Sequence, residues 1–69
     1  MKADQLYYGR EVFVNGYLAK VVKRPGVIHG LYGSYDDDLC EVEFVGEKPP
    51  SWDQHVLIGI NRCEEVKDV

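Results

Sequence analysis

Two cysteines and two histidines are side chains of the types that bind zinc: His29, Cys40, His55 and Cys63. Structural zinc sites usually take their ligands in close pairs such as Cys-x2-Cys, because one turn then presents two ligands together. The four residues stand singly in the sequence, so their spacing favours buried cysteines and surface histidines over a metal site. The sequence leaves open whether the two cysteines meet in the fold.

Three consecutive aspartates, Asp36, Asp37 and Asp38, are of a type that binds Ca²⁺, and Glu47 stands at the twelfth position counted from Asp36. A calcium-binding loop of this kind needs glycine at its sixth position for the sharp turn. The sequence has Glu41 there, inside an alternating run. We therefore expect no bound metal and a polar turn whose aspartates hydrogen-bond nearby backbone N–H groups.

The cysteines and glycines do not have the setting that catalysis needs. A nucleophilic cysteine requires a base and electropositive surroundings in order to ionise. Cys40 stands on the apolar face of an expected strand, and Cys63 is followed by two glutamates. The glycines of residues 30–33 are not followed by the Gly-Lys-Ser/Thr of a phosphate-binding loop. We expect a protein that is not an enzyme and needs no cofactor.

Large aromatic side chains are the strongest candidates for contact with a partner, because they supply area with few rotors to immobilise. The segments around residues 32–35 and 49–52 could converge at one end of a barrel. Tyr32, Tyr35, Trp52 and Asp36 would then form an aromatic cage for a cation such as methylated lysine. The alternative, weighed equally, is that Trp52 covers the core and that Tyr7 or Tyr8 seals an open barrel mouth.

Strands are the elements that must position these residues, because apolar residues alternate and helical periodicity is nearly absent. Residues 11–14 lead into Asn15-Gly16, the pair that type I′ hairpin turns favour because both positions need positive φ. A return strand of residues 17–24 ends before the proline and glycine that follow it. This hairpin is the best-defined local prediction.

The second half of the chain predicts further short strands. Residues 27–28 are a short extended piece, and residues 39–45 alternate as in a half-buried strand. Residues 56–60 predict a fourth strand, residues 61–64 one turn of 3₁₀ helix, and residues 65–67 a short last strand. Such short strands favour a small, strongly bent sheet that closes into a partly open barrel.

Size and charge restrict the organisation and the partners of the chain. Sixty-nine residues predict a single domain, 1–69, in which residues 1–5 are a loose tail. Twelve acidic and eight basic side chains give a net charge of −4, which disfavours binding to a phosphate backbone. The only local basic cluster is Lys20, Lys23 and Arg24.

The opening residues lack the apolar run of a signal peptide, and the longest apolar runs are far too short to span a membrane. We therefore expect a cytoplasmic protein that does not bind membranes. In a reducing compartment the two cysteines would remain thiols.

The segments 6-LYYGREVFVNG-16, 19-AKVV-22, 40-CEVEFVG-46 and 58-IGINRCEEV-66 together resemble the SH3-like small barrels, with a Tudor-like or KOW-like layout. The resemblance covers roughly residues 6 to 68 and rests on apolar alternation and turn glycines. It implies an all-β, five-stranded, partly open SH3-like barrel and a binding or scaffolding role.

We therefore expect a non-enzymatic protein-interaction or accessory module whose aromatic and acidic loops bind a protein partner. The expected contact residues are Tyr32, Tyr35, Asp36, Asp37, Asp38 and Trp52. The aspartates would steer a basic partner. One alternative is a homo-oligomeric assembly protein that pairs through an exposed edge strand such as 56–60. A second is nucleic-acid binding through the basic cluster at residues 20–24 and stacked tyrosines, which the net charge disfavours.

Overall fold

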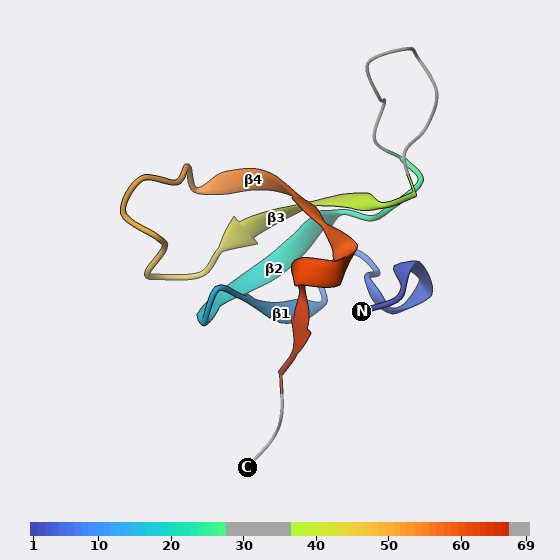
Figure 1. Cartoon of the computed structure of the whole chain (residues 1–69), viewed down its shortest axis with the longest axis horizontal. Coiled ribbons are helices and arrows are strands. Elements are labelled where there is room, and N and C mark those ends of the chain that lie inside the picture. The colour runs from blue at the N-terminus through green and yellow to red at the C-terminus, as the bar shows by residue number, and fades with distance from the viewer. Residues whose placement is uncertain (28–36, 67–69) are drawn as a thin grey trace.

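The computed structural model describes residues 1–27 and 37–66, which form one antiparallel five-stranded sheet (Figure 1). The strands are β1 (Glu11–Val14), β2 (Tyr17–Lys23), β3 (Leu39–Phe44), β4 (His55–Gly59) and β5 (Glu64–Glu65). Two 3₁₀ turns, η1 (Ala3–Gln5) and η2 (Ile60–Arg62), are the only helical elements of the described residues. None of the helices in these ranges has the length and apolar character needed to cross a membrane.

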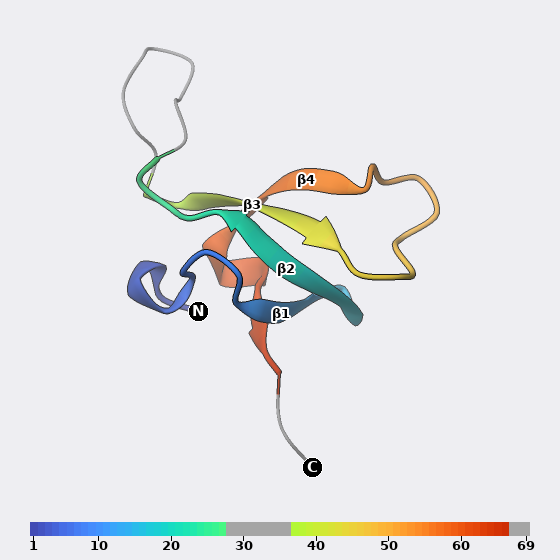
Figure 2. The same ribbon diagram turned by 180° about the vertical axis from the view of Figure 1, so that it is seen from behind.

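The strand order β4-β3-β2-β1-β5 is linear, with β4 and β5 at the two edges. The sheet is bent but not closed, as the two opposite views show (Figures 1 and 2). This confirms an all-β fold with five antiparallel strands, and the open sheet is consistent with a partly open barrel.

The β1–β2 hairpin forms where the sequence predicts it. Val14 pairs with Tyr17 across the turn. Asn15 and Gly16 have φ values of 51° and 81°, the positive angles that a type I′ turn requires at both central positions. The turn twist matches the twist of the strands, so the hairpin is specified by local chemistry alone.

Strands β3 and β4 are also antiparallel neighbours, and their bounds differ slightly from the expected ones. The predicted strand 39–45 ends one residue earlier, and the predicted strand 56–60 is shifted by one residue. Ile60 instead begins η2, which the N–H of Cys63 closes by donating to the Ile60 carbonyl at 3.3 Å. The predicted last strand 65–67 lies at Glu64–Glu65, which pairs with β1, and position 67 is outside the described residues.

The core lies on the inner face of the bent sheet. Every second residue of β3 is buried, because successive side chains of a strand point to opposite faces. The buried side chains come from all parts of the described chain: Leu6, Val12, Val14, Ala19, Val21, Cys40, Val42, Phe44, Ile58 and Cys63. Met1, Tyr17, Trp52, Val56 and Ile60 pack against this cluster from its margins.

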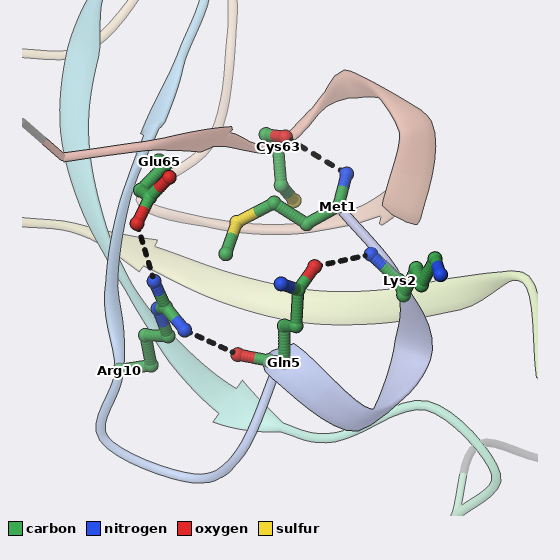
Figure 3. Close-up of polar contacts among 6 residues, drawn as sticks. All are labelled: Met1, Lys2, Gln5, Arg10, Cys63 and Glu65. Atoms are coloured by element: carbon green, nitrogen blue, oxygen red, sulfur yellow. Dashed lines mark hydrogen bonds and ion pairs between the residues drawn. The ribbon is translucent and has the colours of Figure 1, made fainter.

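Residues 1–5 are not a loose tail. They contain η1, and the amino group of Met1 donates to the Ile60 carbonyl at 3.1 Å. The same amine donates to the Cys63 carbonyl at 3.3 Å (Figure 3). Arg10 Nη1 donates to the carbonyl of Gln5 at 3.2 Å. The bonds of the Met1 amine join residues 59 and 62 positions apart, so no local pattern in the sequence indicates them.

Candidate functional site

A cleft of about 360 Å³ opens between η1 and the turn that follows β2. Its lining residues are Ala3, Asp4, Leu6, Tyr7, Arg24, Pro25, Gly26 and Val27. Clefts that bind small ligands typically have volumes of roughly 300–1,000 Å³. The cleft lies at the lower end of this range.

Tyr7 is the large aromatic side chain of the cleft, and the backbone around it is held to β2. The N–H of Gly9 donates to the Val21 carbonyl at 2.8 Å, and the N–H of Arg10 donates to the Tyr7 carbonyl at 3.1 Å. The guanidinium of Arg10 lies 5.7 Å from the centre of the Tyr7 ring, which is cation–π distance. Tyr7 is therefore an exposed ring, 58% accessible, on a fixed frame.

Arg10 also ties this corner to the far edge of the sheet. Its Nη2 lies 3.7 Å from Glu65 Oε1 on β5, and its Nη1 bonds to Gln5 (Figure 3). One side chain thus touches η1, the Tyr7 ring and β5. We infer that Arg10 holds the cleft wall in place.

Asp37 adds a carboxylate beside the cleft. A methyl group placed at Gly26 would come within 3.1 Å of Asp37 Oδ1, so this oxygen lies next to a lining residue. Asp4 and Arg24 supply one acidic and one basic side chain, both exposed. The cleft therefore combines an aromatic ring with carboxylates that face solvent.

Trp52 lies far from this cleft, in the loop between β3 and β4. Its ring meets the Phe44 ring edge-on, with 6.0 Å between the ring centroids. The backbone N–H of Trp52 donates to the Pro49 carbonyl. Phe44 ends β3, whereas Asp37 and Asp38 precede its first residue. These segments therefore occupy opposite ends of the strand (Figures 1 and 2).

A six-residue strand is roughly 20 Å long, so Trp52 and Asp37 lie near opposite ends of β3. The expected convergence joins Trp52 to residues 32–35, which are outside the described residues, and it stays a prediction. The alternative that Trp52 covers the core agrees with its half-buried position against Phe44. The sequence could not separate these readings, because both place an aromatic ring in a loop.

The remaining predicted contact residues have different outcomes. Tyr32, Tyr35 and Asp36 lie outside the described residues. Asp37 and Asp38 are exposed and form a turn, as expected, and the Asp38 carbonyl accepts the Ile60 N–H at 2.9 Å.

Tyr7 lines the cleft but is not among the expected contact residues; the alternative expectation was that Tyr7 or Tyr8 seals an open barrel mouth. Both Tyr7 and Tyr8 are largely exposed, at 58% and 72%, so neither does this. The available signal in the sequence was the apolar Leu6 directly before the two tyrosines. Leu6 fills the core, and the side chains of Tyr7 and Tyr8 are exposed.

The basic cluster does not stand alone on the sheet. Lys20 is paired in register with Glu11 on one side and Glu43 on the other. Lys23 is paired with Glu41. Acidic neighbours on adjacent strands reduce the positive potential of these lysines, which weighs against a phosphate-binding surface.

The four candidate zinc ligands are not assembled as a set. Cys40 and Cys63 meet in the core, with 3.8 Å between their sulfurs. His55 lies on the outer face, where its Nε2 is 3.5 Å from Glu43 Oε2. His29 is outside the described residues. Within residues 1–27 and 37–66 no three potential metal ligands of the His, Cys, Asp and Glu types cluster.

Comparison of the chain with models of protein families, with curated proteins and with solved structures finds no match.

Proposed function

We propose that the chain is a non-enzymatic interaction module of SH3-like architecture whose cleft beside Tyr7 binds an extended segment of a protein partner. Support for the architecture comes from the five-stranded order, in which the short last strand follows a 3₁₀ turn and pairs with the first. The resemblance drawn from the sequence implies the same arrangement. Small barrels of this kind are mostly binding modules, which is an argument by analogy.

The exposed Tyr7 ring beside the cleft is the observation that carries the proposal. Tyrosine is enriched among the residues that dominate binding energy, because it offers a large rigid surface with a polar tip. The Arg10 contact and the backbone bonds to β2 hold the ring before a partner arrives. Binding then costs little additional ordering.

The chemistry of the cleft indicates the kind of segment that fits. An apolar side chain would pack against the exposed side chains of Tyr7 and Val27. A lysine or arginine of the segment would face Asp37 and Asp4, and the aspartates at 36–38 would steer it by long-range attraction. Attraction between exposed charges is screened beyond about 8–10 Å at physiological salt, so association should slow as salt rises.

A library of random peptides displayed on phage tests this proposal. Enriched peptides are synthesised, and their dissociation constants are measured for the wild type, Tyr7→Ala and Tyr8→Ala. Tyr8 is the matched control, because it is an adjacent exposed tyrosine that does not line the cleft. Loss of a hot-spot side chain costs about 2 kcal/mol, so Tyr7→Ala should weaken binding by at least about tenfold. Tyr8→Ala should change it by less than about twofold.

Two outcomes would contradict the proposal. One is that the enriched peptides bind Tyr7→Ala as tightly as the wild type. The other is that the wild type enriches no peptide above a chain of the same length and charge but scrambled sequence. Circular dichroism of each variant shows that the fold is retained.

A second candidate function, homo-oligomeric assembly, is favoured by one observation. Strand β4 stands at an edge of the sheet and carries Leu57, which is 57% exposed. An open strand edge can pair with a second copy of the same strand. The mass in solution at several concentrations would show it, and Leu57→Lys should lower the mass of any assembly. A monomer at every concentration would exclude this function.

A further inference from the structure

Two thiols from distant parts of the chain meet inside the core. Cys40 lies on β3, and Cys63 lies between η2 and β5. Their sulfurs are 3.8 Å apart and share a hydrogen bond, and neither is part of a disulfide. Strand β3 and strand β5, which begins directly after Cys63, are not neighbours in the sheet, because β2 and β1 stand between them. A bond between the sulfurs would join the two limbs of the bent sheet across the core.

The distance is suited to such a bond. A disulfide places its sulfurs about 2.05 Å apart, so the present 3.8 Å separation must shorten by about 1.8 Å. Small rotations of the two side chains can share this shift. Both cysteines lie on the core side, so the pair is intramolecular and screened from other copies of the chain.

We propose that Cys40 and Cys63 are a modification site for peroxides, which convert the dithiol into an internal disulfide that links β3 to the start of β5. The two sulfurs have different roles, which follow from their surroundings.

We expect Cys63 to react first, because it stands in the loop between η2 and β5 and is 2% exposed, whereas Cys40 is fully buried on β3. The hydrogen bond between the two sulfurs lets one thiol lose its proton while the other keeps its own. The same hydrogen bond lowers the pKa of the Cys63 thiol, and burial opposes this shift. Met1 lies beside Cys63 at the margin of the core, is partly buried, and donates from its amine to the Cys63 carbonyl (Figure 3).

The chemistry takes two steps. The Cys63 thiol first gives its proton to solvent. The thiolate attacks one oxygen of the peroxide, the O–O bond breaks, and Cys63 is oxidised to a sulfenic acid. The hydroxide that leaves takes up a proton from solvent and becomes the first water. Cys40 then attacks the Cys63 sulfur, the S–S bond forms and the S–O bond breaks. The hydroxyl leaves with the Cys40 proton as water. Two thiols and one hydrogen peroxide thus give one disulfide and two waters, with the peroxide as the oxidant.

The test exposes the folded wild type to hydrogen peroxide, quenches it with catalase and maps the peptides by mass spectrometry. We expect a monomer in which the Cys40 and Cys63 peptides are joined, with the loss of two hydrogens. Peptide mapping is needed because Met1, the only methionine, can take up an oxygen. A disulfide closing a loop of this length should raise Tm by roughly 10 °C, and dithiothreitol should reverse the rise.

Two matched variants test the order of events. Cys40→Ala should form a sulfenic acid at Cys63 that dimedone traps, whereas Cys63→Ala should not be trapped at Cys40. Neither variant should gain stability from peroxide.

Three outcomes would overturn the proposal: disulfide-linked dimers as the main product, sulfinic acid without an internal bond, or a native dithiol that stays reduced at peroxide levels that oxidise the chain in urea. The mapping of the wild type stands even where a variant fails to fold.

Discussion

The two ends of strand β3 use aromatic side chains in opposite ways. At the Phe44 end, Trp52 folds back and packs on the core. At the Leu39 end, Tyr7 stays exposed beside the cleft. An aromatic side chain therefore covers the core at one end of β3 and is exposed to solvent at the other.

The difference follows from what already fills the core at each end. Leu6 is fully buried next to Tyr7, so the inward position is taken and the following ring turns outward. At the other end, the long loop of residues 45–54 can return over the inner face and place Trp52 against Phe44. An exposed aromatic on a fixed backbone is the better candidate for contact with a partner.

The largest expected effect is at the packed end. Phe44 is 1% exposed, and its ring contacts Tyr17 and Trp52 with centroid distances of 6.4 Å and 6.0 Å. Phe44→Ala should cost roughly 3–5 kcal/mol of unfolding free energy, because it removes a buried ring and leaves a cavity. A domain of this length is stable by roughly 3–10 kcal/mol, so the variant should be partly or wholly unfolded. Urea titration followed by circular dichroism measures this, and a cost below about 1 kcal/mol would contradict the packing.

Trp52→Ala should have the next largest effect. Trp52 is half buried, so we expect a loss of about 2 kcal/mol, less than for a fully buried ring. Urea titration of Tyr8→Ala is the control, since that ring is 72% exposed. If Trp52→Ala leaves the unfolding free energy unchanged, the ring does not pack on Phe44, and the contrast between the two ends fails.

Two glycines sharpen the comparison further, because they have nearly the same backbone angle at opposite ends. Gly26 has φ +90° and Gly46 has φ +94°. Alanine should cost about 1–2 kcal/mol at either site from backbone strain. Gly26→Ala should cost slightly more, because its methyl group lies 3.1 Å from Asp37 Oδ1 and must displace that exposed carboxylate by a few tenths of an ångström, whereas Gly46 has open space. Thermal melts measure both, and the additional cost at Gly26 should disappear in Gly26→Ala/Asp37→Ala. Equal costs for Gly26→Ala and Gly46→Ala would indicate that Asp37 does not lie beside Gly26.

The smallest effect is expected at the exposed tyrosines. Tyr8→Ala should change the unfolding free energy by less than about 0.5 kcal/mol, as surface substitutions usually do. Tyr7→Ala should cost about 0.5–1 kcal/mol, because the Arg10 guanidinium loses its ring partner. Tyr7→Phe keeps the ring and should remain close to the wild type in chemical denaturation. A Tyr7→Ala cost as large as that of Trp52→Ala would mean that Tyr7 is a core residue.

Local signals in the sequence are sufficient to predict the strands and the first hairpin. Alternation in residues 11–14 and 39–45 and the Asn15-Gly16 pair are local signals, and local sterics act on them directly. The inward row at Cys40, Val42 and Phe44 could be read for the same reason, since side chains of a strand alternate between faces. Boundaries moved by a residue, because long-range bonds such as Ile60 N–H to Asp38 set the last turn.

Which distant residues meet depends on the folded sheet and could not be predicted from local signals. The contact of Cys40 with Cys63 and the bond of the Met1 amine to η2 join segments that no periodicity connects. So does the position of Asp37 beside Gly26. The same holds for Trp52, whose loop could have turned to either end of β3. Local preferences act over a few residues, whereas these contacts depend on how the whole sheet bends around a core that is too small for every large ring.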